Sequence, residues 1–203
     1  WLATEYIRLG WDTKALIRLI VLSSVYRQGA RVEPDHHRLD PRNELLSRFP
    51  RQRLEAEMVR DQALAVGGLL SHKMYGPPVR PPQPSLGLTA AFGSTFDWKA
   101  SEGEDRYRRS LYTFMKRTAP FAMATTFDAP TGEACLARRD VSNSPLQALT
   151  LLNDPVFFSA AGALADRLAA LEGDIDRRLR AGFELCLGRT PSAAELQALR
   201  RHH

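Results

Sequence analysis

The sequence lacks the residues on which most self-contained metal and redox sites depend. Of its 203 residues only two are cysteines, Cys135 and Cys186, and they form no CxxC pair. A zinc ribbon and a self-contained c-type haem site are therefore excluded. The histidines are His36, His37, His72, His202 and His203. Neighbouring side chains point in different directions on most backbones, so neither adjacent pair resembles a metal site. We predict no metal and no cofactor within this chain.

Long apolar runs are also missing. Arg8, Lys14 and Arg18 interrupt the apolar N-terminal segment, and no later run is long enough to cross a bilayer. We therefore predict no transmembrane segment. The chain shows no signal peptide and opens within a helical pattern, so we expect a fragment of a longer protein.

Most catalytic fingerprints are absent as well. We find no GxSxG elbow, phosphate-binding loop, dinucleotide glycine pattern, HExxH or calcium loop. The balance of 28 basic against 23 acidic residues gives a formal charge of +5. This surplus permits nucleic acid or an acidic polymer as a partner but requires neither.

What the sequence does contain is helical pattern. We predict a mainly α, irregular helical domain with a long Pro/Gly-rich loop and room for one or two short strands. It forms a single domain over 1–203, built from a helical first part (1–70), the Pro/Gly-rich loop (71–103), and an Arg-rich segment with C-terminal helices (104–203).

Two helices are predicted in the first part. Asp12 is a good N-cap, and the apolar run over 16–22 is typical of a helix at the centre of a core. Residues 51–70 predict an amphipathic helix. Its apolar stripe is Leu54, Met58, Ala65 and Leu69, and its charged stripe is Arg53, Glu57, Arg60 and Asp61. The charged stripe either faces a ligand or forms ion pairs within the protein, and we favour ion pairs.

The middle of the chain is harder to assign. Five prolines between 77 and 84 rule out regular helix, and the aromatic Phe92, Phe96 and Trp98 should pack. We expect a binding surface in this loop, because long irregular connections are often functional. Residues 104–118 favour a helix, although LYTF also suits a strand. Their arginines and tyrosines could bind nucleic acid, which we disfavour because acidic residues lie beside them.

Helix starts are clearer in the last third. Ser144-Pro145, Asp154-Pro155 and Thr190-Pro191 each pair a capping side chain with proline, and Glu195 can close a capping box on Ser192. Cys186 falls on an apolar stripe and is best explained as a small buried residue.

The stretch over 127–155 gathers Asp128, Glu133, Cys135, Arg138, Arg139 and Asp140. Asp128 and Glu133 could act as paired carboxylates, and Cys135 near two arginines could be a reactive thiolate. No histidine lies nearby to serve as its base. We favour a packed cysteine beside structural ion pairs.

This stretch, FDAPTGEACLARRDVSNSPLQALTLLNDPVFF, resembles the hallmark of the planctomycete cytochrome-associated domain of unknown function, the PSD-one domain. GWDTKALIRLIVLSSVYRQ, DPRNELLSRFPRQRLEAEMVRDQAL, GEDRYRRSLYTFMKRTAP and LGRTPSAAEL resemble further segments of that domain, in the same order. The chain corresponds to its central and C-terminal part. It departs from the expected pattern at Met115, where a tryptophan is typical.

The resemblance implies a context rather than a reaction. Members are large exported bacterial proteins, many with a cytochrome c-like module, so haem c would belong to a separate upstream module. It implies an extracytoplasmic location, periplasmic or at the cell surface, and other domains of the same polypeptide as partners.

The candidate polar cluster combines the charged stripes with this stretch. Its members are Arg53, Glu57, Arg60, Asp61, Arg106, Arg109, Arg117, Asp128, Glu133, Cys135 and Arg139. Three hypotheses follow: a non-catalytic scaffold or interaction module, which we favour; a hydrolytic enzyme acting on polysaccharide; and a nucleic-acid-binding basic module. The sequence assigns no catalytic residue.

Overall fold

The computed structural model describes residues 1–32, 34–84, 98–116 and 120–202, and it divides the chain into two compact units. Unit 1 spans residues 1–53 and unit 2 spans residues 54–203. The boundary falls within the predicted helical first part. Across the described ranges the chain is helical, with two isolated β-bridges and no longer strand. The prediction of a mainly α fold is therefore confirmed.

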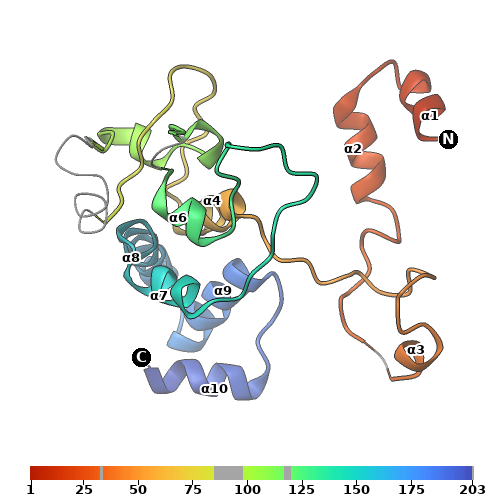
Figure 1. Ribbon diagram of the computed structural model, residues 1–203. Helices are drawn as coiled ribbons and strands as arrows, with labels where there is room; N and C mark the ends of the chain where they lie inside the picture. The colour runs from red at the N-terminus through yellow and green to blue at the C-terminus, as the bar shows by residue number, and fades with distance from the viewer. Residues whose placement is uncertain (33, 85–97, 117–119, 203) are drawn as a thin grey trace. The chain divides into compact units, whose positions relative to one another are not determined.

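The described residues of unit 1 form three short helices (Figure 1). They are α1 (Leu2–Arg8), α2 (Thr13–Val21) and α3 (Pro34–Leu39). The Asp12 carboxylate accepts the Ala15 N–H, which confirms the predicted cap of α2. The prediction that this helix is central to a core is wrong, because no residue of α2 is buried. Ile17, for example, is 52% exposed.

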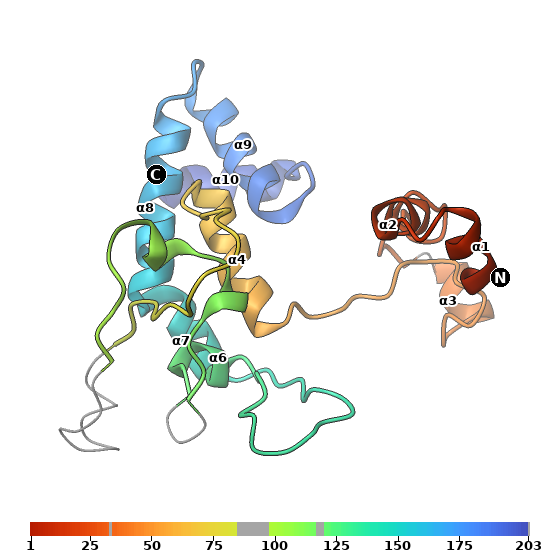
Figure 2. The same ribbon diagram turned by 90° about the horizontal axis from the view of Figure 1, so that it is seen from above.

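Unit 2 is built around α4 (Ala56–Gly67) and α8 (Pro155–Ala169), which lie side by side in both views (Figures 1 and 2). The buried face of α4 consists of Ala56, Arg60, Leu64 and Gly67. The predicted apolar stripe is wrong in part, because Leu54 and Met58 are exposed. The pattern assigned Arg60 to the surface, whereas hydrogen bonds to the backbone keep it in the interior.

Close approach of these two helices depends on Gly67. A Cβ atom added to Gly67 would lie 2.7 Å from the Ala160 carbonyl oxygen of α8. Leu64, Val156 and Ala160 form one buried cluster at this contact. A second cluster joins α4 and α8 to α6 (Ala122–Thr126). Its buried members are Ala56, Phe121, Met123, Phe127 and Phe157.

The helix predicted over 104–118 is wrong. The chain instead makes two 3-10 turns, η1 (Gly103–Tyr107) and η2 (Ser110–Tyr112), and bridges to Ser71 and Val79. Tertiary contacts override the local helical preference here, because backbone groups of this segment form hydrogen bonds with other segments. For example, the Tyr107 carbonyl accepts the Ser71 N–H at 2.9 Å. Trp98 stacks on Phe121 at 5.8 Å, as predicted for the aromatic residues of the loop. Phe92 and Phe96 lie outside the described residues.

In the C-terminal third of the chain, capping side chains set where the helices begin. Ser144 and Asp154 cap α7 (Pro145–Asn153) and α8, and both predictions are confirmed. Then come α9 (Ile175–Leu187) and α10 (Ala193–His202). The last helix starts later than Thr190-Pro191, because Ser192 forms the capping box with Glu195 and sets the first turn. Cys186 on α9 is half-buried, and this burial raises the pKa of its thiol.

No single helix among the described residues is long and apolar enough to cross a membrane. By length and composition alone, α7 and α8 would suffice together, but they are bent by 54° at their junction.

Candidate functional site

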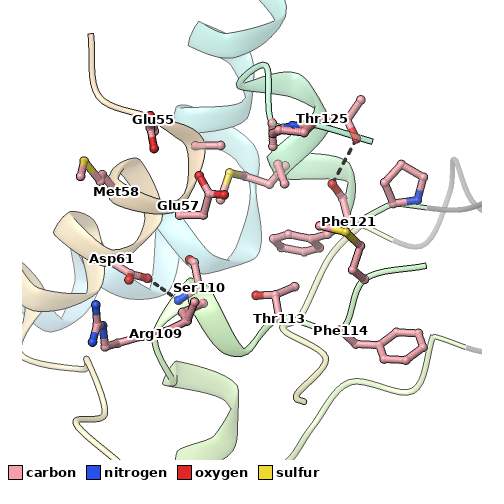
Figure 3. A pocket seen from close by; sticks show the side chains of 18 of the residues that line it. Glu55, Glu57, Met58, Asp61, Arg109, Ser110, Thr113, Phe114, Phe121 and Thr125 are labelled. Carbon is pink, nitrogen blue, oxygen red and sulfur yellow. Dashed lines mark hydrogen bonds between the residues drawn. The ribbon is translucent and has the colours of Figure 1, made fainter. Parts of the chain in front are cut away.

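A hollow of about 780 Å³ opens on unit 2 beside α4, and we call it the α4 groove (Figure 3). It is bordered by α4, by η2 and the residues after it, by α6, and by the loop that follows α6. Its charged lining residues are Glu55, Glu57, Asp61, Arg109 and Arg139. Four members of the predicted polar cluster therefore meet here, although they come from segments up to 82 residues apart.

Arg60 lies behind the groove and holds the η1–η2 segment in place. Its side chain is fully buried, and its two Nη atoms each donate to a carbonyl, of Arg106 and of Arg108, at 2.8 Å. Burial lowers the pKa of Arg60 to about 10, against the opposing charges of Asp61 and Asp154. Arg60 is therefore a cation at neutral pH, and its donors bind backbone carbonyls instead of a ligand.

Asp61 joins the same two elements from the groove side. Its Oδ1 accepts the Ser110 N–H at 2.7 Å, and it lies 3.6 Å from Arg60 Nη1 (Figure 3). One helical turn of α4 thus supplies a cation for two carbonyls and a carboxylate for an N–H of the neighbouring segment. The predicted charged stripe does bridge to another element, with Arg60 inside the protein.

Arg139 brings the loop after α6 back to the start of α4. Its guanidinium donates to both carboxylate oxygens of Glu57, at 2.6 and 3.1 Å, and lies 3.3 Å from Glu55. Burial alone would raise the pKa of Glu57, but the hydrogen bonds and charge of Arg139 outweigh burial and lower it. The Glu57 bond raises the pKa of Arg139 in turn. This is a bidentate pair of the strong kind.

Asp128 closes the base of the same loop rather than facing the groove. It has a positive φ of 62°, and its carboxylate accepts the Ser142 N–H at 2.7 Å and the Ser142 hydroxyl at 2.8 Å. Gln147 is buried beside it and donates to the Thr126 carbonyl and the Ser142 hydroxyl. The two ends of the loop are therefore fastened together where α6 ends and α7 begins.

The remaining predicted residues lie elsewhere. Glu133 and Cys135 are exposed on the loop, so the prediction of a packed Cys135 is wrong: all residues over 131–138 are exposed and give it nothing to pack against. The exposed Arg106 guanidinium lies 5.8 Å from the ring centroid of Tyr107. Arg53 ends unit 1. Arg117 is outside the described residues.

Arg108 is the residue that the sequence most clearly failed to single out. It is 1% exposed, donates to the carbonyls of Pro77 and Tyr75, and stacks 3.8 Å from the Tyr112 ring centroid. RYRR contains three arginines, Arg106, Arg108 and Arg109, and no period distinguishes those that lie inside from those that lie outside. Only the path of residues 71–79 around this side chain makes it a core residue.

The family model of PSD1, described as "Protein of unknown function (DUF1553)", matches residues 1–203. The chain belongs to the PSD1 family. No curated protein and no solved structure matches it. The PSD1 match extends over both units, so the polar contacts described above belong to a domain whose function the family description leaves open.

Proposed function

We propose that this PSD1 chain is a non-catalytic scaffold and interaction module of a larger exported protein. In this proposal the partners are other domains of the same polypeptide, including a cytochrome c-like module, and the location is periplasmic or at the cell surface. The support for the context is the resemblance of its five segments to the domain of large exported planctomycete proteins.

The observation that carries the proposal is how the polar cluster is used. Arg60 holds two backbone carbonyls, Arg139 holds Glu57, and Asp128 holds Ser142. Each contact fastens segments that are distant along the chain. Groups committed in this way maintain a rigid surface, as a scaffold requires, and are not free to transfer protons.

The two alternatives find less support. A hydrolytic site needs two carboxylates facing one bond. Glu57 and Asp61 both line the α4 groove, but Arg139 and the Ser110 N–H occupy them. Nucleic-acid binding by the Arg-rich segment requires exposed tyrosines, whereas Tyr112 is half-buried under Arg108.

A pair of substitutions tests the structural role of the cluster. Arg139→Ala should cost about 1 kcal/mol, since the pair is partly exposed, and lower the melting temperature by about 2–4 °C. Asp128→Ala should lower the free energy of unfolding by about 2 kcal/mol, because it removes hydrogen bonds that Ser142 donates to a charged carboxylate. Arg138→Ala, at the exposed neighbouring position, is the control and should leave melting unchanged. Variants that melt like the wild type but lose a polysaccharide-cleaving activity would overturn the proposal.

The proposed context has a separate test. Translating the coding region upstream of Trp1 should show a signal peptide and a CxxCH haem motif. A start codon beside Trp1 with neither feature would contradict the exported, cytochrome-linked context.

A further inference from the structure

The lining of the α4 groove is unusual for a surface held together by ion pairs, because most of it is apolar. Phe114, Phe121, Met58, Met115, Met123 and Leu111 contribute to it. Met115 and Leu111 are 65% and 70% exposed at its edge. Methionine and phenylalanine present soft, adaptable surface to apolar ligands. The volume, about 780 Å³, falls in the usual range of about 300–1,000 Å³ for small-molecule sites.

One cation at the groove has no partner for its charge among the residues that the structure describes. Arg109 is exposed, and within the described ranges its guanidinium forms no ion pair. The other charged residues of the lining all have charged or polar contacts: Arg139 holds Glu57 and lies 3.3 Å from Glu55, and Asp61 accepts the Ser110 N–H beside Arg60. Arg109 would therefore attract an acidic group of a ligand.

A buried hydroxyl supplies a second polar point. Thr113 lines the groove, and its Oγ1 is buried without a hydrogen-bond partner among the residues that the structure describes. Figure 3 shows this hydroxyl on the side of Thr113 that faces Ser110. Buried polar groups left unpaired are unfavourable, so a rotation of the Thr113 side chain that brings its hydroxyl into contact with a ligand oxygen would be favourable.

We infer that the α4 groove binds a small amphiphilic carboxylate, with its apolar chain or ring on the methionines and phenylalanines and its acidic end between Arg109 and Thr113. A sugar chain would need many hydrogen-bonding groups, and this lining offers few. The site lies beyond the scaffold role and stands independently of it.

Decanoate is a suitable probe, kept below the concentration at which it forms micelles. Isothermal titration of the full chain should show saturable binding at one site. Decyltrimethylammonium, with the same chain and the opposite charge, should bind at least about tenfold more weakly, because Arg109 repels it.

Four variants locate the site. Arg109→Gln should weaken decanoate binding about tenfold and leave decanol binding unchanged, while Arg201→Gln, an exposed arginine on α10, should change neither. Ala65→Trp adds a large side chain on α4 inside the groove and should abolish binding. Ala165→Trp, at an exposed alanine of α8 outside the groove lining, is its matched control. Both tryptophan variants should melt like the wild type.

A last variant addresses the hydroxyl. Thr113→Val keeps the shape of the side chain, so it should preserve folding and weaken decanoate several-fold. Absence of saturable decanoate binding, or equal affinity in wild type, Arg109→Gln and Ala65→Trp, would overturn the inference. Binding of a leucine-rich amphipathic peptide but not of decanoate would also overturn it, in favour of a polypeptide partner.

Discussion

Arg60 occupies a position that a hydrophobic residue would normally fill. It lies on the buried face of α4 between Ala56 and Leu64, with no exposed surface. Burying a charge is unfavourable unless hydrogen bonds and nearby opposite charges offset the loss of water. Carbonyls of Arg106 and Arg108 satisfy two of them, so the side chain anchors the irregular η1–η2 segment that borders the groove.

We predict that Arg60→Met destabilises unit 2 by about 3 kcal/mol, because two carbonyls lose their donors in a dry environment. Arg60→Lys should cost nearly as much, since one ammonium cannot reproduce the planar fork. Urea unfolding measures both, with Arg201→Met on α10 as an exposed control. Full stability of Arg60→Met would show that the carbonyls find other donors.

At the scale of single residues, the sequence predicted which charged side chains form contacts better than it predicted which of them are buried. Glu57, Asp61 and Arg139 were all predicted to form internal contacts, and they do. Arg60 and Arg108 could not be placed inside, because hydrophobic patterning assigns every arginine to the surface. Their burial depends on carbonyls from segments 31 to 48 residues away, which no local window contains.

Elements were predictable where a side chain marks their start. Asp12, Ser144 and Asp154 cap helices as expected, since the cap bonds are local. The segment over 104–118 was not predictable. Its Ser110 N–H bonds to Asp61 and its Tyr112 carbonyl to Val79, and these long-range bonds replace a helix.

The contact between α4 and α8 yields a prediction about glycine. Gly67→Ala should destabilise by about 1–3 kcal/mol, because the added Cβ would meet the Ala160 carbonyl at 2.7 Å. Gly162→Ala, in α8 with open space around it, is the matched control and should stabilise by about 0.4–1 kcal/mol. Thermal unfolding of both variants measures the difference. Equal effects would mean that the two helices separate without cost.

The start of α10 should respond to acid. Hydrogen bonds from Arg189 and then from Ser192 lower the pKa of Glu195 from 4.5 to about 2. Because the folded value lies below the unfolded one, the ionised carboxylate stabilises the fold above pH 4.5. This contribution is lost as the pH falls toward about 2.

Glu195→Gln should therefore lose part of the acid sensitivity of melting between neutral pH and about pH 2. Melting of both proteins at a series of pH values measures the difference, and Glu172→Gln, an exposed glutamate elsewhere, is the control. Identical pH profiles for Glu195→Gln and wild type would show that the capping box does not contribute to stability.

At the scale of the whole molecule, the buried apolar residues among those that the structure describes are confined to unit 2. Both hydrophobic clusters lie there, whereas the one buried residue among the described part of unit 1 is Asp40. The sequence pointed to a core around the apolar run at 16–22, because it was rich in leucine and isoleucine. Composition of a helix does not reveal whether other elements cover it, and here α1 is its packing partner.

This distribution predicts that unit 2 folds without unit 1. A protein consisting of residues 54–203 should unfold in one cooperative transition, since α4, α6 and α8 and their clusters all lie within it. A protein consisting of residues 1–53 should show no cooperative transition, because it buries too little apolar surface to offset chain entropy. Circular dichroism and calorimetry of both fragments measure these transitions.

The α4 groove belongs wholly to residues 54–203, so this fragment should also bind decanoate like the full chain. Failure of this fragment to fold would show that the stability of unit 2 depends on residues 1–53.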